Sequence, residues 1–236
     1  MLSSVIALSL GLLLSTAHFL SHKTFKFFEK FHDETKSLSA GMFITYIILE
    51  MFPEIGSGAS FIGENVYLLF LAGFVSFHAL EKFVYQHVTY KSDLLHDLEH
   101  LHVAGFVLDG FLAGLFVSML LDFPMPYGFL AFLAFIPFLL HVFSSAVTLE
   151  HLHEHLKTSL PEKIFLSSAP FLGALASVCV GFTPSTFYMV FSFLTGTLFY
   201  SVVRDAIPSG KVGKLNYFFL GIALSLLLLY IARFPL

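Results

Sequence analysis

The positive charges of this chain alternate between its hydrophobic segments. Of its twelve Lys and Arg residues, eleven lie in or beside the connections that follow the first, third, fifth and seventh segments, and Arg233 alone lies near the C-terminus. Short loops that carry Lys and Arg stay on the cytoplasmic side of a membrane. The pattern predicts eight membrane spans, with both termini outside. The spans are expected near residues 2–20, 39–53, 65–84, 103–121, 128–149, 163–182, 185–203 and 216–235.

The composition leaves little of the chain outside these segments. It is 57% hydrophobic and 12% charged, with a mean hydropathy of +0.85, whereas a soluble domain carries about 25% charged residues. A span takes roughly 20 apolar residues, so eight spans use most of the 236 residues. We expect one all-α membrane domain over residues 1–236, in an inner or plasma membrane. The single cysteine, Cys179, is expected to be a small buried residue.

Two of the segments share a pattern of special residues. The second contains Gly41, Glu50 and Pro53, and the seventh contains Gly196 and then Asp205 and Pro208 at the same spacings. By the loop charges these two spans run in opposite directions. Inverted repeats of this kind are the usual build of secondary transporters. We therefore predict a 3+2+3 arrangement, in which spans 1–3 and 6–8 are the repeats. The alternative is a chance likeness between two hydrophobic helices.

Ionisable groups inside a bilayer are costly and therefore informative. The deepest are Asp109 and His141, in the fourth and fifth segments. A carboxylate and an imidazole suit a borderline divalent ion such as Zn²⁺ or Fe²⁺. The alternative is a hydrogen-bonded pair that only holds two helices together. Nearer the ends of the third segment lie His78 and Glu81, which are expected to be interfacial.

Two histidine clusters flank this core on the predicted cytoplasmic side. Histidines four residues apart on one helix face, such as His96 and His100, can grip one metal ion. Histidine-rich tracts are a compositional sign of metal binding, although a solvated helix end and loop would carry the same residues. The predicted metal relay consists of His87, His96, His100, His102, His151, His153 and His155.

The residues around these positions resemble the ZIP (Zrt/Irt-like) family of divalent-metal transporters over nearly the whole length. The stretch from Gly41 to Pro53 and Glu54 is similar to the family's second span, which typically ends His-x-x-Pro-Glu. Residues 73–82 are similar to the third span, and residues 196–208 to the seventh. The resemblance implies eight spans, outside termini, a three-plus-two-plus-three arrangement, and a metal held between spans 4 and 5.

The metal-binding motifs depart from the family pattern. The fourth span of the family carries His-Asn-x-x-Asp-Gly, of which this chain keeps only Asp109 and Gly110. The fifth usually reads His-Glu-x-Pro-His/Glu, of which His141 remains, with Ser145 at the second ligand position. Glu50 stands where the second span has its histidine. The resemblance thus implies one site, made by Asp109 and His141 with Ser145 or Glu50 nearby, in place of a two-metal centre.

These patterns together indicate a carrier for a divalent cation rather than an enzyme. The expected substrate is Zn²⁺, Fe²⁺ or Mn²⁺, Zn²⁺ foremost, moving toward the cytoplasm, with no organic cofactor. No basic patch suggests nucleic acid, and no phosphate loop or nucleophile elbow is found. The expected partners are the lipid bilayer and the metal ion, and a homodimer stays open. Two alternatives remain: a ZIP-like protein that senses or buffers metal without transport, and a membrane-embedded metalloenzyme that uses the histidine clusters.

Overall fold

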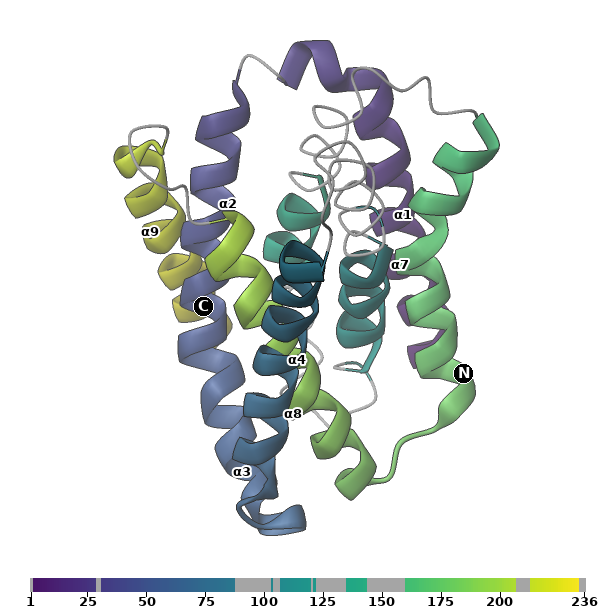
Figure 1. Cartoon of the computed structure of the whole chain (residues 1–236), viewed down its shortest axis with the longest axis vertical. Coiled ribbons are helices and arrows are strands. Elements are labelled where there is room, and N and C mark those ends of the chain that lie inside the picture. The colour runs from purple at the N-terminus through teal and green to yellow at the C-terminus, as the bar shows by residue number, and fades with distance from the viewer. Residues whose placement is uncertain are drawn as a thin grey trace.

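The computed structural model is a bundle of helices (Figure 1). It describes residues 2–28, 31–87, 103, 107–119, 121, 135–143, 160–206 and 213–233. Over these residues the chain forms eight helical segments and no strand. The all-helical class predicted from the sequence is therefore confirmed for the described part of the chain.

The helices follow one another along the chain with short turns where the turns are described. Helix α3 ends at Gly63, whose positive φ of 63° suits a residue without a Cβ. Helix α8 begins after Thr183, whose side chain accepts a hydrogen bond from the Thr186 N–H. The elements are α1 (Leu2–Phe28), α2 (His32–Tyr46), the π-helix η2 (Ile47–Met51), α3 (Phe52–Ile62), α4 (Asn65–His87), α7 (Leu160–Val180), α8 (Pro184–Ser201), the π-helix η3 (Val202–Ala206) and α9 (Leu215–Arg233), with helices also at 107–119 and 135–143.

Four of the described helices are long and apolar enough to cross a membrane. They are Leu2–Ser21, Asp33–Ile62, Leu160–Val180 and Pro184–Arg204, and the apolar helices at Asn65–Leu80, Val107–Met119 and Leu215–Ile231 are shorter. The second is much longer than the segment 39–53 expected from the sequence. Its helix continues through Pro53, the second residue of α3, although a proline has no N–H to donate to the preceding turn.

Each of two long helices contains one π-helical stretch. Segment η2 lies between α2 and α3, and η3 directly follows α8. The N–H of Phe52 bonds to the carbonyl of Ile47, five residues back, as a π-turn requires. A proline follows each segment in the sequence, Pro53 in one case and Pro208 in the other. Because a proline ring clashes with the carbonyl four residues before it, a widened turn at this place has a direct cause.

Three pairs of helices pack closely: α1 with α7, α2 with α9, and α4 with α8. Glycines allow all three approaches, as small residues do between membrane helices, and a Cβ at Gly11 of α1 would collide with Ala174 of α7. A Cβ at Gly41 would collide with the carbonyl of Phe218 in α9, and a Cβ at Gly196 with the carbonyl of Phe70 in α4. The facing glycines, Gly221 and Gly73, are equally confined by backbone atoms of α2 and α8.

These close approaches predict that Gly196→Ala destabilises the fold. The added Cβ would meet backbone atoms of α4, and overpacking of this kind costs about 1–3 kcal/mol. The matched control is Gly56→Ala, because the nearest heavy atom to a Cβ there is the Tyr67 hydroxyl, at 3.8 Å. We expect a lower thermal unfolding midpoint for the first variant in detergent and an equal or higher one for the control. Equal midpoints for both variants would contradict the close packing.

The closest described contacts group the helices into two bundles, which share one hydrophobic core. The first bundle consists of α1, α7 and the helix at 107–119, in which Gly110 and Gly114 approach Pro170. The second bundle consists of α2–η2–α3, α4, α8–η3 and α9; α3 contacts α8, and η3 contacts α2. Figure 1 shows α1 and α7 side by side at the right and α2 with α9 at the left. The helix at 135–143 lies between the two bundles, since Phe138 contacts both Phe116 and Phe43.

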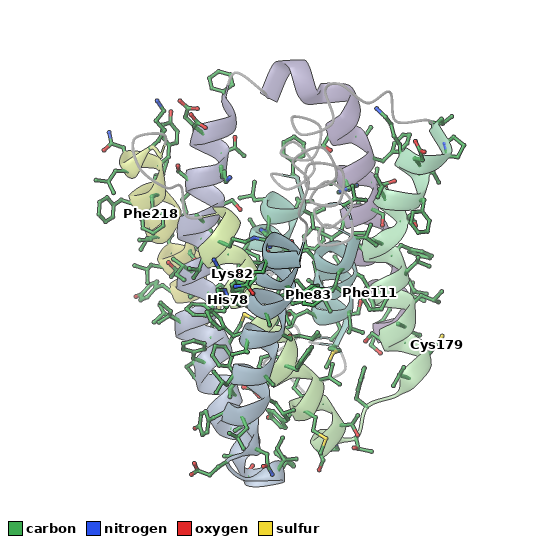
Figure 2. The ribbon with its side chains drawn as sticks, viewed as in Figure 1. His78, Lys82, Phe83, Phe111, Cys179 and Phe218 are labelled. Atoms are coloured by element: carbon green, nitrogen blue, oxygen red, sulfur yellow. The ribbon has the colours of Figure 1, made fainter. Side chains whose placement is uncertain are left out.

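The burial of the single cysteine differs from the expectation. Cys179 is exposed on α7, and Figure 2 shows it at the outer edge of the bundle. The buried face of α7 is carried instead by small residues such as Gly173, Ala174 and Ser177. Cys179 falls beside that face, so its side chain is not part of the core.

Candidate functional site

The structure brings Asp109 and His141 into direct contact. The His141 Nε2 atom lies 2.5 Å from the Asp109 Oδ2 atom, where an imidazole N–H donates to the carboxylate. The two side chains come from different helices, 107–119 and 135–143. Both residues are buried, with 7% of Asp109 and 3% of His141 exposed. A carboxylate and an imidazole are thus paired deep inside the bundle.

A chain of aromatic rings begins beside His141. The Phe43 ring lies 5.0 Å from the His141 ring and 4.8 Å from the Phe138 ring. Phe116 stacks on Phe138 on one side and on Phe191 of α8 on the other. The residues Phe43, Phe116, Phe138 and Phe191 are at most 1% exposed. Because apolar surroundings keep the effective dielectric constant low, charge at the pair interacts more strongly than it would in water.

Local packing explains why Asp109 stands where it does. The glycine that follows it, Gly110, faces the ring of Pro170 in α7 at contact distance, and Gly114 approaches the Pro170 carbonyl more closely still. In return, Gly173 approaches the backbone of Phe111. Small residues on both helices therefore fix the helix at 107–119 against α7. Asp109 is therefore positioned by two packed helices and not by a loop.

The other predicted ligands are not assembled around the pair. Among the described residues, no three His, Cys, Asp or Glu side chains lie together closely enough to hold a metal ion. Glu50 stands on η2, half-buried, and is therefore not brought into a three-residue group with Asp109 and His141. Ser145 lies outside the described residues. The role of Asp109, His141, Glu50 and Ser145 as metal ligands stays a prediction.

The predicted histidine relay falls almost entirely outside the part of the chain that the structure describes. Only His87 belongs to a described helix, as the last residue of α4, and its side chain is not described. The relay therefore stays a prediction. The remaining members, His96, His100, His102, His151, His153 and His155, lie outside the described residues.

A second polar group lies where α4 meets α8. The His78 ring meets the Tyr200 ring edge-on at 5.7 Å, and the Arg204 guanidinium lies 5.7 Å from the centre of the same ring. Figure 2 shows His78 one turn before Lys82 on α4. The sequence predicted an interfacial position for His78 and for Glu81, whose side chain is not described. The tyrosine that both basic residues contact was not anticipated, because nothing in the sequence shows which helix faces α4.

Another contact missed at the sequence level joins α3 to α8. The Tyr188 hydroxyl donates to the Glu54 carboxylate at 2.7 Å, and the Tyr188 ring stacks on Phe61 at 5.0 Å. Gly58 makes room for this ring, since a Cβ there would collide with it. The Glu54 carboxylate is therefore already engaged in a structural hydrogen bond. The spacing of Glu54 and Gly58, one turn apart on the same helix, was the only available signal.

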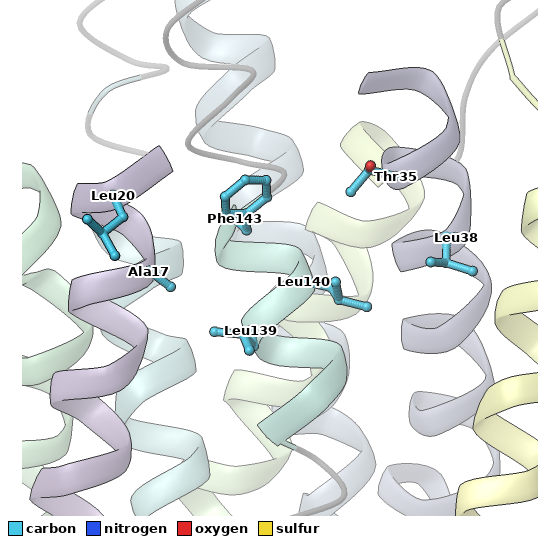
Figure 3. A pocket seen from close by; sticks show the side chains of 7 residues that line it. All are labelled: Ala17, Leu20, Thr35, Leu38, Leu139, Leu140 and Phe143. Carbon is cyan, nitrogen blue, oxygen red and sulfur yellow. The ribbon is translucent and has the colours of Figure 1, made fainter. Parts of the chain in front are cut away.

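An apolar cavity of about 500 Å³ separates part of the two bundles. Figure 3 shows its walls, which include Leu20 of α1, Leu38 of α2 and Leu140 of the helix at 135–143. The lining is almost wholly hydrocarbon, with Thr35 as its polar member. This cavity offers no ligands to a metal ion. It shows that α1 and α2 are not tightly packed at this level.

Comparisons with known proteins leave the family open. No protein-family model matches the chain, and no curated protein matches it. The ZIP resemblance therefore rests on the short motifs alone.

Proposed function

We propose that this protein is a membrane carrier for a divalent metal cation, with Asp109 and His141 as its central binding site. The observation that carries the proposal is the buried contact between these two side chains inside an apolar helix bundle. Ionisable groups at such positions commonly mark ion pathways. The apolar length of four described helices is compatible with a membrane protein.

The register of the π-helical segments supports an internal repeat. Segment η2 begins six residues after Gly41, and η3 begins six residues after Gly196. Each segment has its acidic residue, Glu50 or Asp205, in the fourth of its five positions. The contacts follow the same rule, since η3 contacts α2 and η2 contacts α8. If each of the first three spans is superposed on its counterpart among the last three, the π-helical segments, their acidic residues and their contacts correspond. The proposed 3+2+3 arrangement requires this correspondence.

The glycine contacts obey the same exchange. Gly41 of the second span is confined by α9, the eighth span, and Gly196 of the seventh span by α4, the third. In the proposed repeats α2 corresponds to α8, α9 to α4, and α1 to α7. The pair formed by α2 and α9 therefore corresponds to the pair formed by α8 and α4, and the pair formed by α1 and α7 corresponds to itself. Repeats of this kind, run in opposite directions through a membrane, permit two related conformations with the site open to either side.

The boundary between the bundles suggests which parts move. Phe116 stacks on Phe191 and Phe138 packs on Phe43 across it, so apolar rings form this part of the boundary. The first bundle, together with the helix at 135–143, carries both Asp109 and His141. A displacement of that unit along the aromatic surface of the second bundle would carry the bound cation with it. Sliding of packed helices is a recognised form of such transitions.

The geometry of the pair also suggests how a cation is loaded. A zinc ion bound to both Nε2 and Oδ2, about 2.1 Å from each in tetrahedral geometry, would hold these atoms roughly 3.4 Å apart. The 2.5 Å hydrogen bond must therefore open, and the proton between the two atoms must leave. Cation binding at this site is thus expected to release a proton. The remaining coordination positions would come from water, Ser145 or further ligands outside the described residues.

Transport into proteoliposomes tests the proposal. Purified protein should take up labelled Zn²⁺, Mn²⁺ or Fe²⁺ in a saturable manner, and protein-free vesicles should not. A protein that binds these ions but moves none of them would support the sensor or buffer alternative. That alternative is favoured by one observation, that the described residues bring no third His, Cys, Asp or Glu side chain to Asp109 and His141.

The proposed topology predicts the labelling of single cysteines. In a Cys179→Ser background, a cysteine at Thr158 should react with membrane-impermeant maleimide only from the cytoplasmic side, because it lies in a lysine-bearing connection. A cysteine at Glu64, in the turn between α3 and α4, should react only from outside. The Cys179→Ser background is needed because Cys179 is itself exposed. Labelling of both positions from the same side would refute the topology.

A further inference from the structure

Four phenylalanine rings form a continuous stack on one side of the central pair. The ring of Phe116 stacks on Phe138 at 5.1 Å and on Phe191 at 5.2 Å, measured between ring centres. Phe191 in turn stacks on Phe187 at 5.3 Å. The interplanar angles are 27°, 28° and 20°, and each of the four residues is at most 2% exposed. The stack is therefore a buried apolar column, built from the helices at 135–143 and 107–119 and from α8.

The order of residues along the helices places this column on the outer side of the pair. In the proposed topology the helix at 107–119 runs outward, so Phe116 lies two turns beyond Asp109, about 10 Å at a rise of about 1.5 Å per residue. The helix at 135–143 runs inward, so Phe138 lies nearly one turn outside His141. The other two rings belong to the first half of α8, which also runs inward. All four rings therefore lie between the level of the pair and the outer ends of their helices.

Packing is looser toward the cytoplasm. The cavity of about 500 Å³ is lined by Leu140, which directly precedes His141 in the chain. Its other walls include Leu20 and Leu38, which belong to the inner halves of α1 and α2 in the proposed topology (Figure 3). The two bundles thus meet in a packed aromatic column on the outer side and are separated by a cavity on the inner side. This asymmetry is the form expected of a carrier that is closed to the outside.

An apolar constriction is a barrier to an ion. A cation that enters it loses hydration water and finds no polar group in exchange, and hydrophobic constrictions close pores by excluding water. The column also reaches the site, because the Phe43 ring lies 4.8 Å from Phe138 and 5.0 Å from the His141 ring. Phe116 and Phe138 belong to the unit that carries the pair, whereas Phe191 and Phe43 belong to the second bundle. The displacement of that unit proposed above would therefore pull the rings apart without breaking a hydrogen bond between them.

We propose that the stack of Phe116, Phe138, Phe187 and Phe191 is the outer gate of this protein, closed in this structure. Within the stack, only the contact between Phe116 and Phe191 joins the unit that carries the pair to the second bundle. The gate therefore opens at that contact. This inference rests on the proposed transport function and names how access to its central site is controlled.

Labelling of a cysteine placed behind the gate tests the inference. Leu112 is buried, three residues after Asp109 and four before Phe116, on the helix face that both share. In a Cys179→Ser background, Leu112→Cys should react slowly with a small membrane-impermeant methanethiosulfonate added from outside. Phe191→Ala should raise this rate about tenfold or more. Loss of a packed phenylalanine disfavours the closed arrangement by more than the roughly 1.4 kcal/mol that corresponds to a factor of ten.

The matched control removes a ring from the same helix, away from the gate. Phe199 lies two turns after Phe191 on α8, and its ring contacts Phe52, Phe70 and Phe74 within the second bundle. Its replacement in Phe199→Ala should therefore leave the outer labelling rate unchanged. The rates are measured in right-side-out vesicles from the mass added to the purified protein.

Three results would overturn the gate: equal acceleration by Phe191→Ala and Phe199→Ala, no acceleration by either, or acceleration only from the cytoplasmic face. If Phe191→Ala fails to fold, Phe191→Leu, which keeps an apolar side chain without the flat ring, decides by the same comparison with Phe199→Leu. The labelling needs no transported ion. A wild-type protein that moves no Zn²⁺, Mn²⁺ or Fe²⁺ would overturn the proposed function, while the labelling rates still decide whether the column closes the outer side.

Discussion

Asp109→Ala is expected to lower cation transport about a hundredfold. The carboxylate supplies the only negative charge of the buried pair, and placing a charge uncompensated in hydrocarbon costs about 3 kcal/mol, which corresponds to roughly two powers of ten in rate. Asp109→Asn should lose nearly as much, because the amide keeps the shape and gives up the charge. His141→Ala should fall to a similar level, since it removes the nitrogen that faces the carboxylate. Initial rates of labelled Zn²⁺ uptake into proteoliposomes measure all three.

The appropriate control removes a partly buried polar contact elsewhere. Tyr188→Phe deletes the hydroxyl that donates to Glu54 at 2.7 Å, yet it keeps the ring that stacks on Phe61. It should cost about 1 kcal/mol of stability and leave the transport rate within about twofold of the wild-type value. If Asp109→Ala and His141→Ala both transport at wild-type rates, the central site lies elsewhere in the bundle. The pair would then be a hydrogen bond that holds two helices together.

The sequence was sufficient to predict the helical segments and to single out Asp109 and His141. Both predictions depend on local features, because a long apolar run forms a helix in any membrane context and a buried ionisable group is rare enough to be conspicuous. The described residues are all-helical in eight segments, and the two side chains are in contact. Their function as metal ligands remains a prediction.

Other features depend on contacts between distant parts of the chain and could not be predicted. The sequence contains 31 phenylalanines, and nothing in their spacing identifies Phe43 as the ring that packs on His141. The predicted end of the second segment was wrong, and the reason is local. Pro53 was taken as its limit, whereas a π-turn before it lets the helix run on to Ile62.

The proposed repeat illustrates how structural features can support a weak sequence signal. Matching positions of Gly, acid and Pro in two hydrophobic segments could arise by chance. The same acidic positions fall within π-turns, and the same glycines fall at helix contacts. A proline follows each π-turn in the sequence, and close packing confines each glycine. The matching residues therefore have matching structural roles. This agreement is what supports inverted repeats over coincidence.

A reversible cross-link between the two bundles is expected to stop transport. Leu20→Cys in α1 and Leu38→Cys in α2 place thiols on the walls of the same 500 Å³ cavity, where a bis-methanethiosulfonate linker of matching length is to join them. If, as proposed, the first bundle moves against the second, joining these residues should lower the uptake rate to about a tenth or less, the loss expected when a barrier rises by at least about 1.4 kcal/mol. Cleavage of the linker with a reductant should restore the rate. Both steps are measured as Zn²⁺ uptake in the Cys179→Ser background.

The same linker placed inside one bundle is the control. It distinguishes a block of the motion between bundles from a disturbance of the fold by the modification. Ser37→Cys and Lys214→Cys join α2 to α9, where the Lys214 N–H donates to the Ser37 hydroxyl at 3.0 Å. Both of these helices belong to the second bundle, so a link between them should leave transport close to its unlinked rate. Equal inhibition by the two links would show that the modification disturbs the fold, not a motion. Full transport by the protein linked between Leu20→Cys and Leu38→Cys would mean that α1 and α2 keep their distance throughout the cycle. The cation would then have to cross between bundles that stay in place, and the aromatic boundary at Phe43 and Phe138 would be a static core.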